Sequence, residues 1–202
     1  MANCKPYVVG IDCGQKTTMG IVDTRGKIVA TTTIKMTDYL EFEEYISGMA
    51  KSLRRIMAGV GGPQMIRGIG IGAPNANFYS GNIEYPSNLP WKGILPLGEL
   101  LYEHLGIPVA VTNDANAAAI GEMTYGVARG MRDFVMVTLG TGVGCGIVVN
   151  GQLVYGHDGF AGEIGHLKMI RGGRSCGCGG KGCLETYASA TGVARTAREY
   201  LA

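Results

Sequence analysis

Residues 159–185 read GFAGEIGHLKMIRGGRSCGCGGKGCLE and hold four soft-metal ligands, His166, Cys176, Cys178 and Cys183, at the spacing H-x9-C-x-C-x4-C. Zinc favours tetrahedral sites made of thiolate and imidazole, and three cysteines with one histidine form a common structural set. The alternative is a disulfide with an odd thiol, but Cys176 and Cys178 are too close in sequence to pair comfortably. We therefore expect these four residues to bind a structural zinc ion.

The same stretch carries two carboxylates that the metal does not need. Glu163 precedes His166 by three residues, and Glu185 follows Cys183 by two. An ion that fixes the histidine and the backbone around Cys183 also fixes these acids, so that a structural metal can build a binding site. The alternative is that both are solvated surface glutamates.

Composition excludes several classes of protein. The chain has 202 residues, of which 46% are hydrophobic and 17% charged, so it can bury a core. A net charge of +2 argues against an electrostatic nucleic-acid partner, and no apolar run is long enough for a membrane span. The chain enters a strand-like run at once, so we expect no signal peptide, and its cysteines read as cytoplasmic thiols.

Two stretches share one organisation. Residues 7–12, 19–23 and 27–34 predict an antiparallel meander with a polar loop at 14–18. Residues 134–139, 146–149 and 152–155 predict a second meander with a loop at 140–144. This repeat indicates a duplicated α/β architecture, and loops of small residues can present backbone N–H groups to a polyphosphate.

Helical spacing predicts helices over 37–58, 97–104, 115–125 and 188–201, with further strands at 65–71 and 109–112. Only one helix follows the second meander, whereas three helical stretches follow the first. By this internal comparison the second domain looks incomplete.

Asn113 and Asp114 stand where a buried strand gives way to a helix. Ligands bind at the carboxyl ends of strands in α/β sheets, and phosphoryl transfer uses an aspartate to orient the attacking hydroxyl. Asn113 beside it can both donate to and accept from a sugar hydroxyl. The alternative role of Asp114 is simply to cap the helix.

These motifs together resemble the ROK family of sugar kinases and sugar-responsive repressors, most of all its bacterial glucokinase-type members. The resemblance rests on Glu163–His166 followed by the cysteines and Gly182–Glu185, and on Asn113–Ala118. Gly140–Gly144 resembles the second phosphate loop of the family. Ser87–Trp91 resembles its sugar-side loop.

The resemblance implies an actin-like, ribonuclease-H-like duplicated α/β fold of two lobes with a cleft. Residues 1–114 would form the N-terminal lobe with the first phosphate loop and the sugar-side loops. Residues 115–202 would form the first part of the C-terminal lobe, with the second phosphate loop and the zinc site. Because family members run well past residue 202, the chain is expected to be a C-terminally truncated member.

The resemblance also implies ATP with Mg²⁺ as phosphoryl donor and the 6-hydroxyl of a hexose as acceptor. Asp114 would be the base, and a homodimer is expected. The sugar would be held by Asn88, Asn113, Asp114, Glu163, His166 and Glu185. The nucleotide would be held by Asp12, Gly14, Lys16, Thr17, Gly140, Thr141, Gly142 and Gly144.

Two local departures from the family stand out. The first phosphate loop usually reads D-x-G-G-T but here reads Asp12-Cys13-Gly14-Gln15-Lys16-Thr17, with one glycine apparently deleted. Gly72-Ala73-Pro74 is followed by Asn75 where glycine is usual.

Two other functions stay open. A ROK-type sugar-responsive repressor would carry an N-terminal helix-turn-helix, for which the sequence before Tyr7 leaves no room. A non-catalytic sugar-binding paralogue or fragment would fit the short first loop and the early end.

Overall fold

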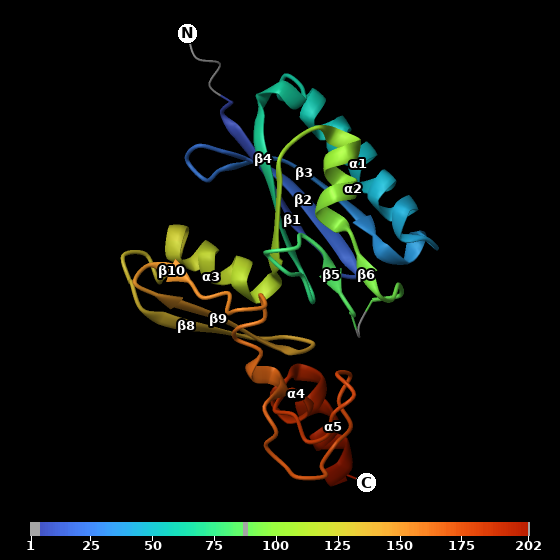
Figure 1. Ribbon diagram of the computed structural model, residues 1–202, viewed down its shortest axis with the longest axis vertical. Helices are drawn as coiled ribbons and strands as arrows, with labels where there is room; N and C mark the ends of the chain where they lie inside the picture. Colours follow the sequence, from blue (N-terminus) through green and yellow to red (C-terminus); the bar gives the residue numbers. More distant parts are fainter. Residues whose placement is uncertain (1–4, 87–88, 202) are drawn as a thin grey trace. The chain divides into compact units, whose positions relative to one another are not determined.

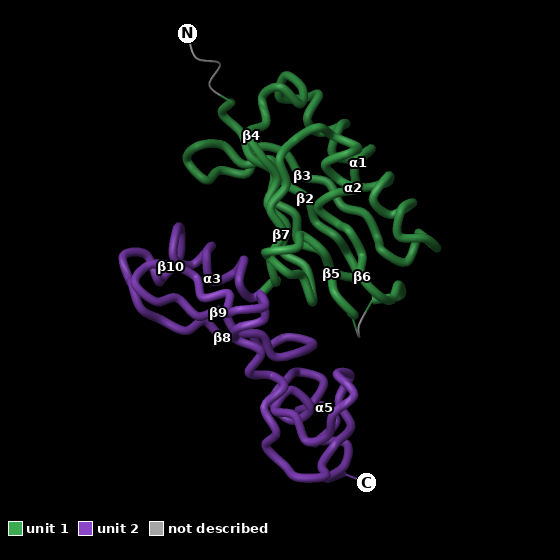
Figure 2. The backbone as a smooth tube through the Cα atoms, in the orientation of Figure 1, with its two compact units in different colours: residues 1–114 green, residues 115–202 purple. Residues whose placement is uncertain are grey.

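The computed structural model describes residues 5–86 and 89–201. The chain divides into two compact units, residues 1–114 and 115–202 (Figures 1 and 2). Each unit is built on a β-sheet and is described by itself below. Among the described residues, no helix combines the length and apolar character needed to cross a bilayer.

The sheet of unit 1 has five strands in the order β3-β2-β1-β4-β7. β1 pairs antiparallel with β2, and β2 with β3, whereas β1–β4 and β4–β7 are parallel pairs. The strands are β1 (Tyr7–Asp12), β2 (Lys16–Asp23), β3 (Ile28–Lys35), β4 (Ile66–Ala73) and β7 (Val109–Asn113). β4 and β7 therefore extend the meander on the free side of β1.

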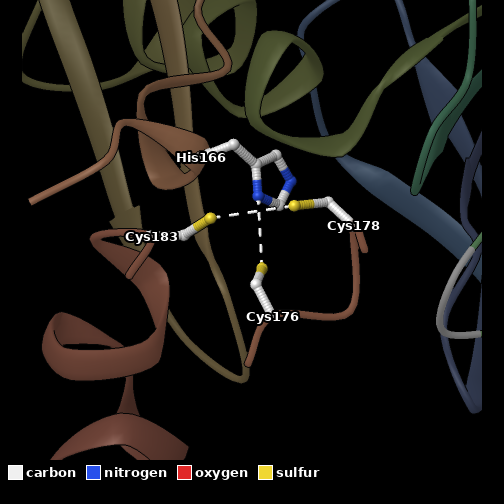
Figure 3. Close-up of side chains that lie close together, drawn as sticks. All are labelled: His166, Cys176, Cys178 and Cys183. Atoms are coloured by element: carbon white, nitrogen blue, oxygen red, sulfur yellow. Dashed lines mark hydrogen bonds between the residues drawn. The ribbon is translucent and has the colours of Figure 1, made fainter. Parts of the chain in front are cut away.

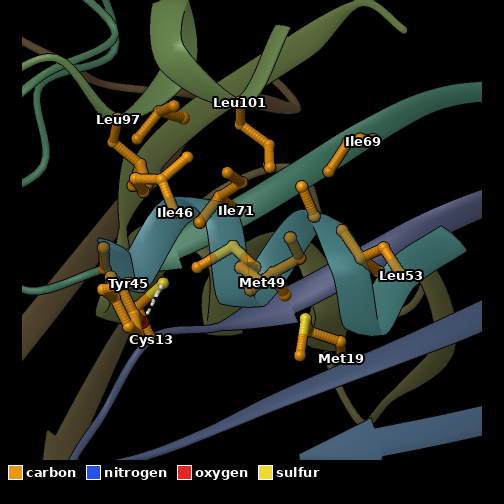
Figure 4. Close-up of a cluster of buried hydrophobic side chains, with 14 of the residues drawn as sticks. Cys13, Met19, Tyr45, Ile46, Met49, Leu53, Ile69, Ile71, Leu97 and Leu101 are labelled. Atoms are coloured by element: carbon orange, nitrogen blue, oxygen red, sulfur yellow. Dashed lines mark hydrogen bonds between the residues drawn. The ribbon is translucent and has the colours of Figure 1, made fainter. Parts of the chain in front are cut away.

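Two helices pack on this sheet and on each other. α1 (Phe42–Ala58) contacts β3 and β2, and α2 (Leu97–Leu105) contacts β7 (Figure 1). Apolar residues at helical spacing give α1 one buried face, which meets the sheet in the main hydrophobic core (Figure 4). The buried residues of that face include Tyr45, Ile46, Met49, Leu53 and Met57.

Short elements complete unit 1. Two 3-10 turns, η1 (Met36–Asp38) and η2 (Pro63–Met65), flank α1, and the two-stranded ribbon of β5 (Ile83–Glu84) and β6 (Ile94–Leu95) precedes α2.

Unit 2 carries a three-stranded antiparallel sheet in the order β10-β9-β8. Its strands are β8 (Phe134–Leu139), β9 (Val143–Val149) and β10 (Gln152–Leu153). α3 (Asp114–Tyr125) packs on this sheet through two glycines of β9. A Cβ at Gly144 would lie 2.8 Å from the Cβ of Ala115, and one at Gly146 would lie 2.5 Å from the Cβ of Ala119. The glycines thus let the alanine-rich helix approach closely.

The rest of unit 2 has little regular structure. A 3-10 turn, η3 (Ile164–His166), lies against β9, and the chain then passes through the cysteines into α4 (Glu185–Ala188) and α5 (Ala190–Leu201).

The strand and helix predictions are confirmed in order and type, but several bounds were wrong. Both small loops are shorter than predicted, because β2 already begins at Lys16 and β9 at Val143. The helix expected from residue 37 begins at Phe42, after η1. The helix predicted over 188–201 begins at Ala190, after a separate short helix, α4, that was not predicted. β10 ends at Leu153 rather than at residue 155.

Candidate functional site

The four predicted metal ligands converge in unit 2. The nitrogen or sulfur atoms that His166, Cys176, Cys178 and Cys183 offer all lie within 4.8 Å of one another (Figure 3). Cys183 is fully buried, Cys176 is 9% exposed and Cys178 is exposed. We call residues 166–185, which carry all four ligands, the cysteine-rich turn.

Two distances in this cluster fit a four-coordinate ion. Zinc–sulfur bonds of about 2.3 Å and zinc–nitrogen bonds of about 2.0 Å in a tetrahedron place sulfurs about 3.8 Å apart and sulfur about 3.5 Å from nitrogen. Here Cys178 Sγ lies 3.7 Å from Cys183 Sγ, and Cys176 Sγ lies 3.6 Å from His166 Nδ1. The described cysteines are all free thiols, so the predicted alternative of a disulfide is wrong for them.

The two ring nitrogens of His166 have different neighbours. Its Nδ1 points at the thiols (Figure 3). Its Nε2 lies 3.9 Å from Glu163 Oε2. A carboxylate behind the second ring nitrogen is the usual companion of a metal-binding histidine, because it fixes the tautomer that leaves the other nitrogen free. Glu163 and His166 thus lie at ion-pair distance, longer than a hydrogen bond, and their shared role as sugar ligands stays a prediction.

A lysine that the sequence analysis missed faces the same thiols. Lys168 Nζ donates a hydrogen bond to Cys183 Sγ over 3.2 Å, which raises the pKa of the lysine. Three thiolates and a neutral imidazole around a divalent ion carry a net charge of −1, which the ammonium offsets. Gly180 makes room for this contact, since a Cβ there would lie 1.9 Å from Nζ.

The thiols of Cys176 and Cys178 differ in acidity. Burial raises the pKa of Cys176 to about 12. The backbone N–H of Gly180 donates to Cys178 and lowers the pKa of that thiol. Metal binding requires deprotonated thiols, so ion uptake releases protons here.

Arg174 fastens the cysteine-rich turn to α5. Its guanidinium donates to the carbonyl oxygens of Thr186 and Gly192, and it pairs with Glu199 over 2.5 Å. The same guanidinium lies 4.6 Å from the centroid of the Tyr187 ring. No periodic pattern pointed to Arg174, because its partners lie in a segment that only folding brings near.

Glu185 links the cysteine-rich turn to the loop between β8 and β9, the second loop (residues 140–142). Its Oε2 accepts a hydrogen bond from Val143 N over 3.1 Å, and its Oε1 lies 3.9 Å from Cys176 Sγ. Gly142 permits this approach, since a Cβ there would lie 2.3 Å from Oε2. Glu185 is therefore an anchor of the second loop as well as a candidate ligand.

Two contacts from the start of α5 also hold the second loop. Ala190 N donates to Gly140 O over 2.9 Å, and Thr191 Oγ1 donates to Thr141 O over 2.9 Å. Gly140 and Thr141 stay exposed. Gly144 was predicted in this loop but lies inside β9 against α3, so its missing side chain serves helix packing.

The loop between β1 and β2, the first loop (residues 13–15), lies in unit 1 next to Asp12 and Lys16. Both flanking side chains are exposed, and Gly14 is half-buried. Thr17 is the exception, since it is fully buried in β2 and its hydroxyl contacts Tyr45 and Gly14 O. The prediction that Thr17 contacts the nucleotide is therefore wrong, because its hydroxyl faces the interior.

Asn113 ends β7 and Asp114 begins α3, which is the strand-to-helix junction that the sequence predicted. Asp114 is exposed and Asn113 is half-buried. Asn88, the remaining candidate sugar ligand, lies outside the described residues.

Comparison with known proteins gives the family context. A sequence model described as the ROK family matches residues 8–202. A glucokinase from Halalkalibacterium halodurans is 42% identical and aligns with 96% of this chain. A xylose repressor from Bacillus subtilis is 33% identical over 91% of the chain.

A solved ROK family glucokinase from Streptomyces griseus, in complex with glucose and AMPPNP, superposes with a TM-score of 0.81 at 33% identity, over 96% of this chain and 60% of that one. The predicted actin-like α/β fold is thereby confirmed. The chain spans 59% of the length of the Halalkalibacterium glucokinase and 48% of the xylose repressor.

Proposed function

The chain belongs to the ROK family, and from that membership we propose that it is part of an ATP-dependent hexose kinase. The reaction transfers the γ-phosphate of ATP to the 6-hydroxyl of glucose, or of a related hexose or N-acetylhexosamine. The observation that carries the proposal is the 42% identity to a glucokinase over 96% of the chain. The Streptomyces griseus glucokinase, solved with glucose and an ATP analogue, supports the same reaction class.

Asp114 is the proposed general base. It is exposed at the first residue of α3, so it can accept the proton of the attacking hydroxyl. Asn113, as a neutral amide, holds a neighbouring sugar hydroxyl. Phosphoryl transfer asks the protein mainly for positioning and charge stabilisation, which suits a single aspartate and polar loops.

The nucleotide is proposed to contact exposed or half-buried groups in and beside both small loops. In unit 1 these are Asp12, Gly14 and Lys16, with the carboxylate directed at Mg²⁺ and the ammonium at phosphate. In unit 2 they are Gly140, Thr141 and Gly142. Thr17 and Gly144 are left out, since one is buried and the other packs on α3.

The cysteine-rich turn is proposed to bind one structural Zn²⁺ through His166, Cys176, Cys178 and Cys183. The distances between these ligand atoms support it. Glu163, His166 and Glu185, which the turn positions, would hold sugar hydroxyls. A cytoplasmic location and a homodimer stay predictions.

Asp114→Asn tests the catalytic proposal. We expect turnover to fall about 10²–10⁴-fold, as for loss of a general base, with sugar affinity nearly unchanged. Asp38→Asn is the matched control, since it removes an exposed aspartate of unit 1 in η1. Coupled assays over a panel of hexoses should be run on residues 1–202 and on the protein at its natural length. Absence of phosphorylation with every sugar on the natural-length protein would sink the proposal.

A second function, sugar-responsive repression, is favoured by the similarity to a xylose repressor. Nanomolar DNA binding at physiological salt, released by a sugar, would favour it over the kinase. Sugar binding in calorimetry without ATP turnover would instead indicate a non-catalytic sugar-binding protein.

A further inference from the structure

A buried network of polar groups lies beneath the first loop in unit 1. The Tyr45 hydroxyl of α1 lies 2.6 Å from Thr17 Oγ1. It also lies 3.7 Å from Cys13 Sγ (Figure 4). Thr17 Oγ1 in turn donates to Gly14 O over 3.2 Å. Tyr45, Thr17 and Cys13 are 1%, 0% and 3% exposed, so water cannot substitute for a missing partner.

The protons of this network have one arrangement that satisfies the loop. A carbonyl can only accept, so the single proton of Thr17 goes to Gly14 O. The 2.6 Å contact then requires Tyr45 to donate to Thr17. Burial raises the pKa of the Cys13 thiol to about 12, so the thiol keeps its proton.

The network acts on the part of the loop that would meet an anion. A phosphate is attracted by backbone N–H groups and repelled by carbonyl oxygens. Gly14 O is engaged by Thr17, and Gln15 O accepts from Met36 N over 3.0 Å. Cys13 N donates to Gly72 O of β4 over 2.9 Å. The two loop carbonyls are thus held by donors of unit 1 itself.

We propose that Tyr45 is a positioning residue of the first loop: its hydroxyl, acting through Thr17, fixes the Gly14 carbonyl and thereby sets the affinity of the loop for nucleotide phosphates. The inference rests on the proposed kinase function. It also explains how a loop shortened by one glycine keeps a defined shape, because side chains beneath it supply the constraint.

The competing explanation is that Tyr45 is only a core residue. Its ring lies 5.0 Å from that of Trp91 and 6.2 Å from that of Phe42, measured between centroids. Tyr45→Phe separates the two explanations, since it keeps the ring and deletes the hydroxyl. Tyr39→Phe is the matched control, because its ring packs edge-on against Tyr45 at 5.8 Å and neither Thr17 nor Cys13 contacts it among the hydrogen bonds described.

The first measurement is hydrogen exchange of the amides of residues 13–16. Loss of a hydrogen bond of ordinary strength predicts exchange about five- to tenfold faster in Tyr45→Phe and in Thr17→Val. Thr17→Ser, which keeps the hydroxyl, should restore the wild-type rate, and Tyr39→Phe should not change it. Unchanged exchange in Tyr45→Phe would overturn the inference.

The second measurement is binding of AMPPNP and of glucose by calorimetry on the protein at its natural length. We expect nucleotide affinity to fall about five- to tenfold in Tyr45→Phe, with glucose affinity unchanged. Faster loop exchange with unchanged nucleotide affinity would overturn the inference but leave the kinase proposal intact. Wild-type protein that binds no nucleotide would instead overturn the proposed function, and this inference with it.

Discussion

Each unit contains a three-stranded antiparallel meander, but the two meanders are stabilised in different ways. In unit 1, β1 has a neighbour on each side, β2 and β4, and its buried residues share one hydrophobic cluster with those of α1 and α2. In unit 2, β8 is at the end of the three-stranded sheet, and its Val135, Val137 and Leu139 are 60%, 47% and 66% exposed. Equal strand patterns therefore do not imply equal cores.

The main hydrophobic core lies in unit 1, and unit 2 lacks a core of that kind among its described residues. All of the core's buried members lie in unit 1, between Val9 and Val111. The buried hydrophobic residues described in unit 2 are alanines, cysteines and two valines. Unit 2 relies instead on close glycine contacts, on the Arg174 and Glu185 ties, and on the convergence of four metal ligands. Removing the metal or one of its ligands should therefore destabilise unit 2 and leave unit 1 folded.

The largest expected effect comes from breaking the metal site. Cys178→Ser, or chelation of the wild type, should abolish zinc binding and unfold the cysteine-rich turn, because metal-binding free energy of about 10–16 kcal/mol is folding free energy in such sites. Elemental analysis gives the zinc content, and hydrogen exchange reports each unit separately. Cys145→Ser, a buried cysteine of β9 outside the cluster, should keep its zinc. An equal loss of protection from hydrogen exchange in unit 1 would contradict the idea that only unit 2 depends on the metal.

The next comparison is a pair of identical truncations. Leu53→Ala removes a fully buried side chain of α1 and should cost about 2–5 kcal/mol of unfolding free energy. Leu139→Ala removes a 66% exposed side chain of β8 and should change it by no more than about 0.5 kcal/mol. Urea titration of each variant checks both values. A large cost at Leu139 would mean that β8 is covered in solution.

A third test compares glycines in the middle strand of each meander. Gly146→Ala in β9 brings its Cβ to 2.5 Å from the Ala119 Cβ and should cost about 1–3 kcal/mol. Gly20→Ala in β2 meets its nearest atom at 3.7 Å and should be neutral or slightly stabilising. Thermal unfolding followed by circular dichroism distinguishes the two. Similar changes in the unfolding temperature of both variants would show that α3 moves to accommodate the added methyl group.

The smallest effect concerns the turn between β2 and β3. The backbone N–H groups of Lys27 and Arg25 donate to the Asp23 carboxylate and lower its pKa. A lowered folded pKa contributes stability above the unfolded value of about 3.9, and this is lost as pH falls through the folded pKa. Asp23→Asn should thus be slightly less stable at pH 7, and the difference should shrink as the pH falls below about 4 and vanish below the folded pKa of Asp23. A difference that persists at low pH would assign the effect to turn geometry alone.

The sequence determined the parts of the molecule that depend on local pattern. Apolar periodicity placed the strands and the helices, and the cysteine spacing selected four ligands that the fold brings together. These patterns can be read from the sequence because each helix or strand buries one face, and because thiols close in sequence can bind the same ion.

Only the tertiary structure decided what the loop-forming residues do. Thr17 and Gly144 looked like phosphate-loop residues, yet one is buried against Tyr45 and the other packs on Ala115. Lys168 and Arg174 gave no signal at all, since the thiol and the carbonyls that they contact lie 12 to 18 residues away along the chain. A threonine or a glycine can occur both in a ligand-binding loop and in a packed strand. Its neighbours in space, which the sequence pattern does not show, decide which role it has.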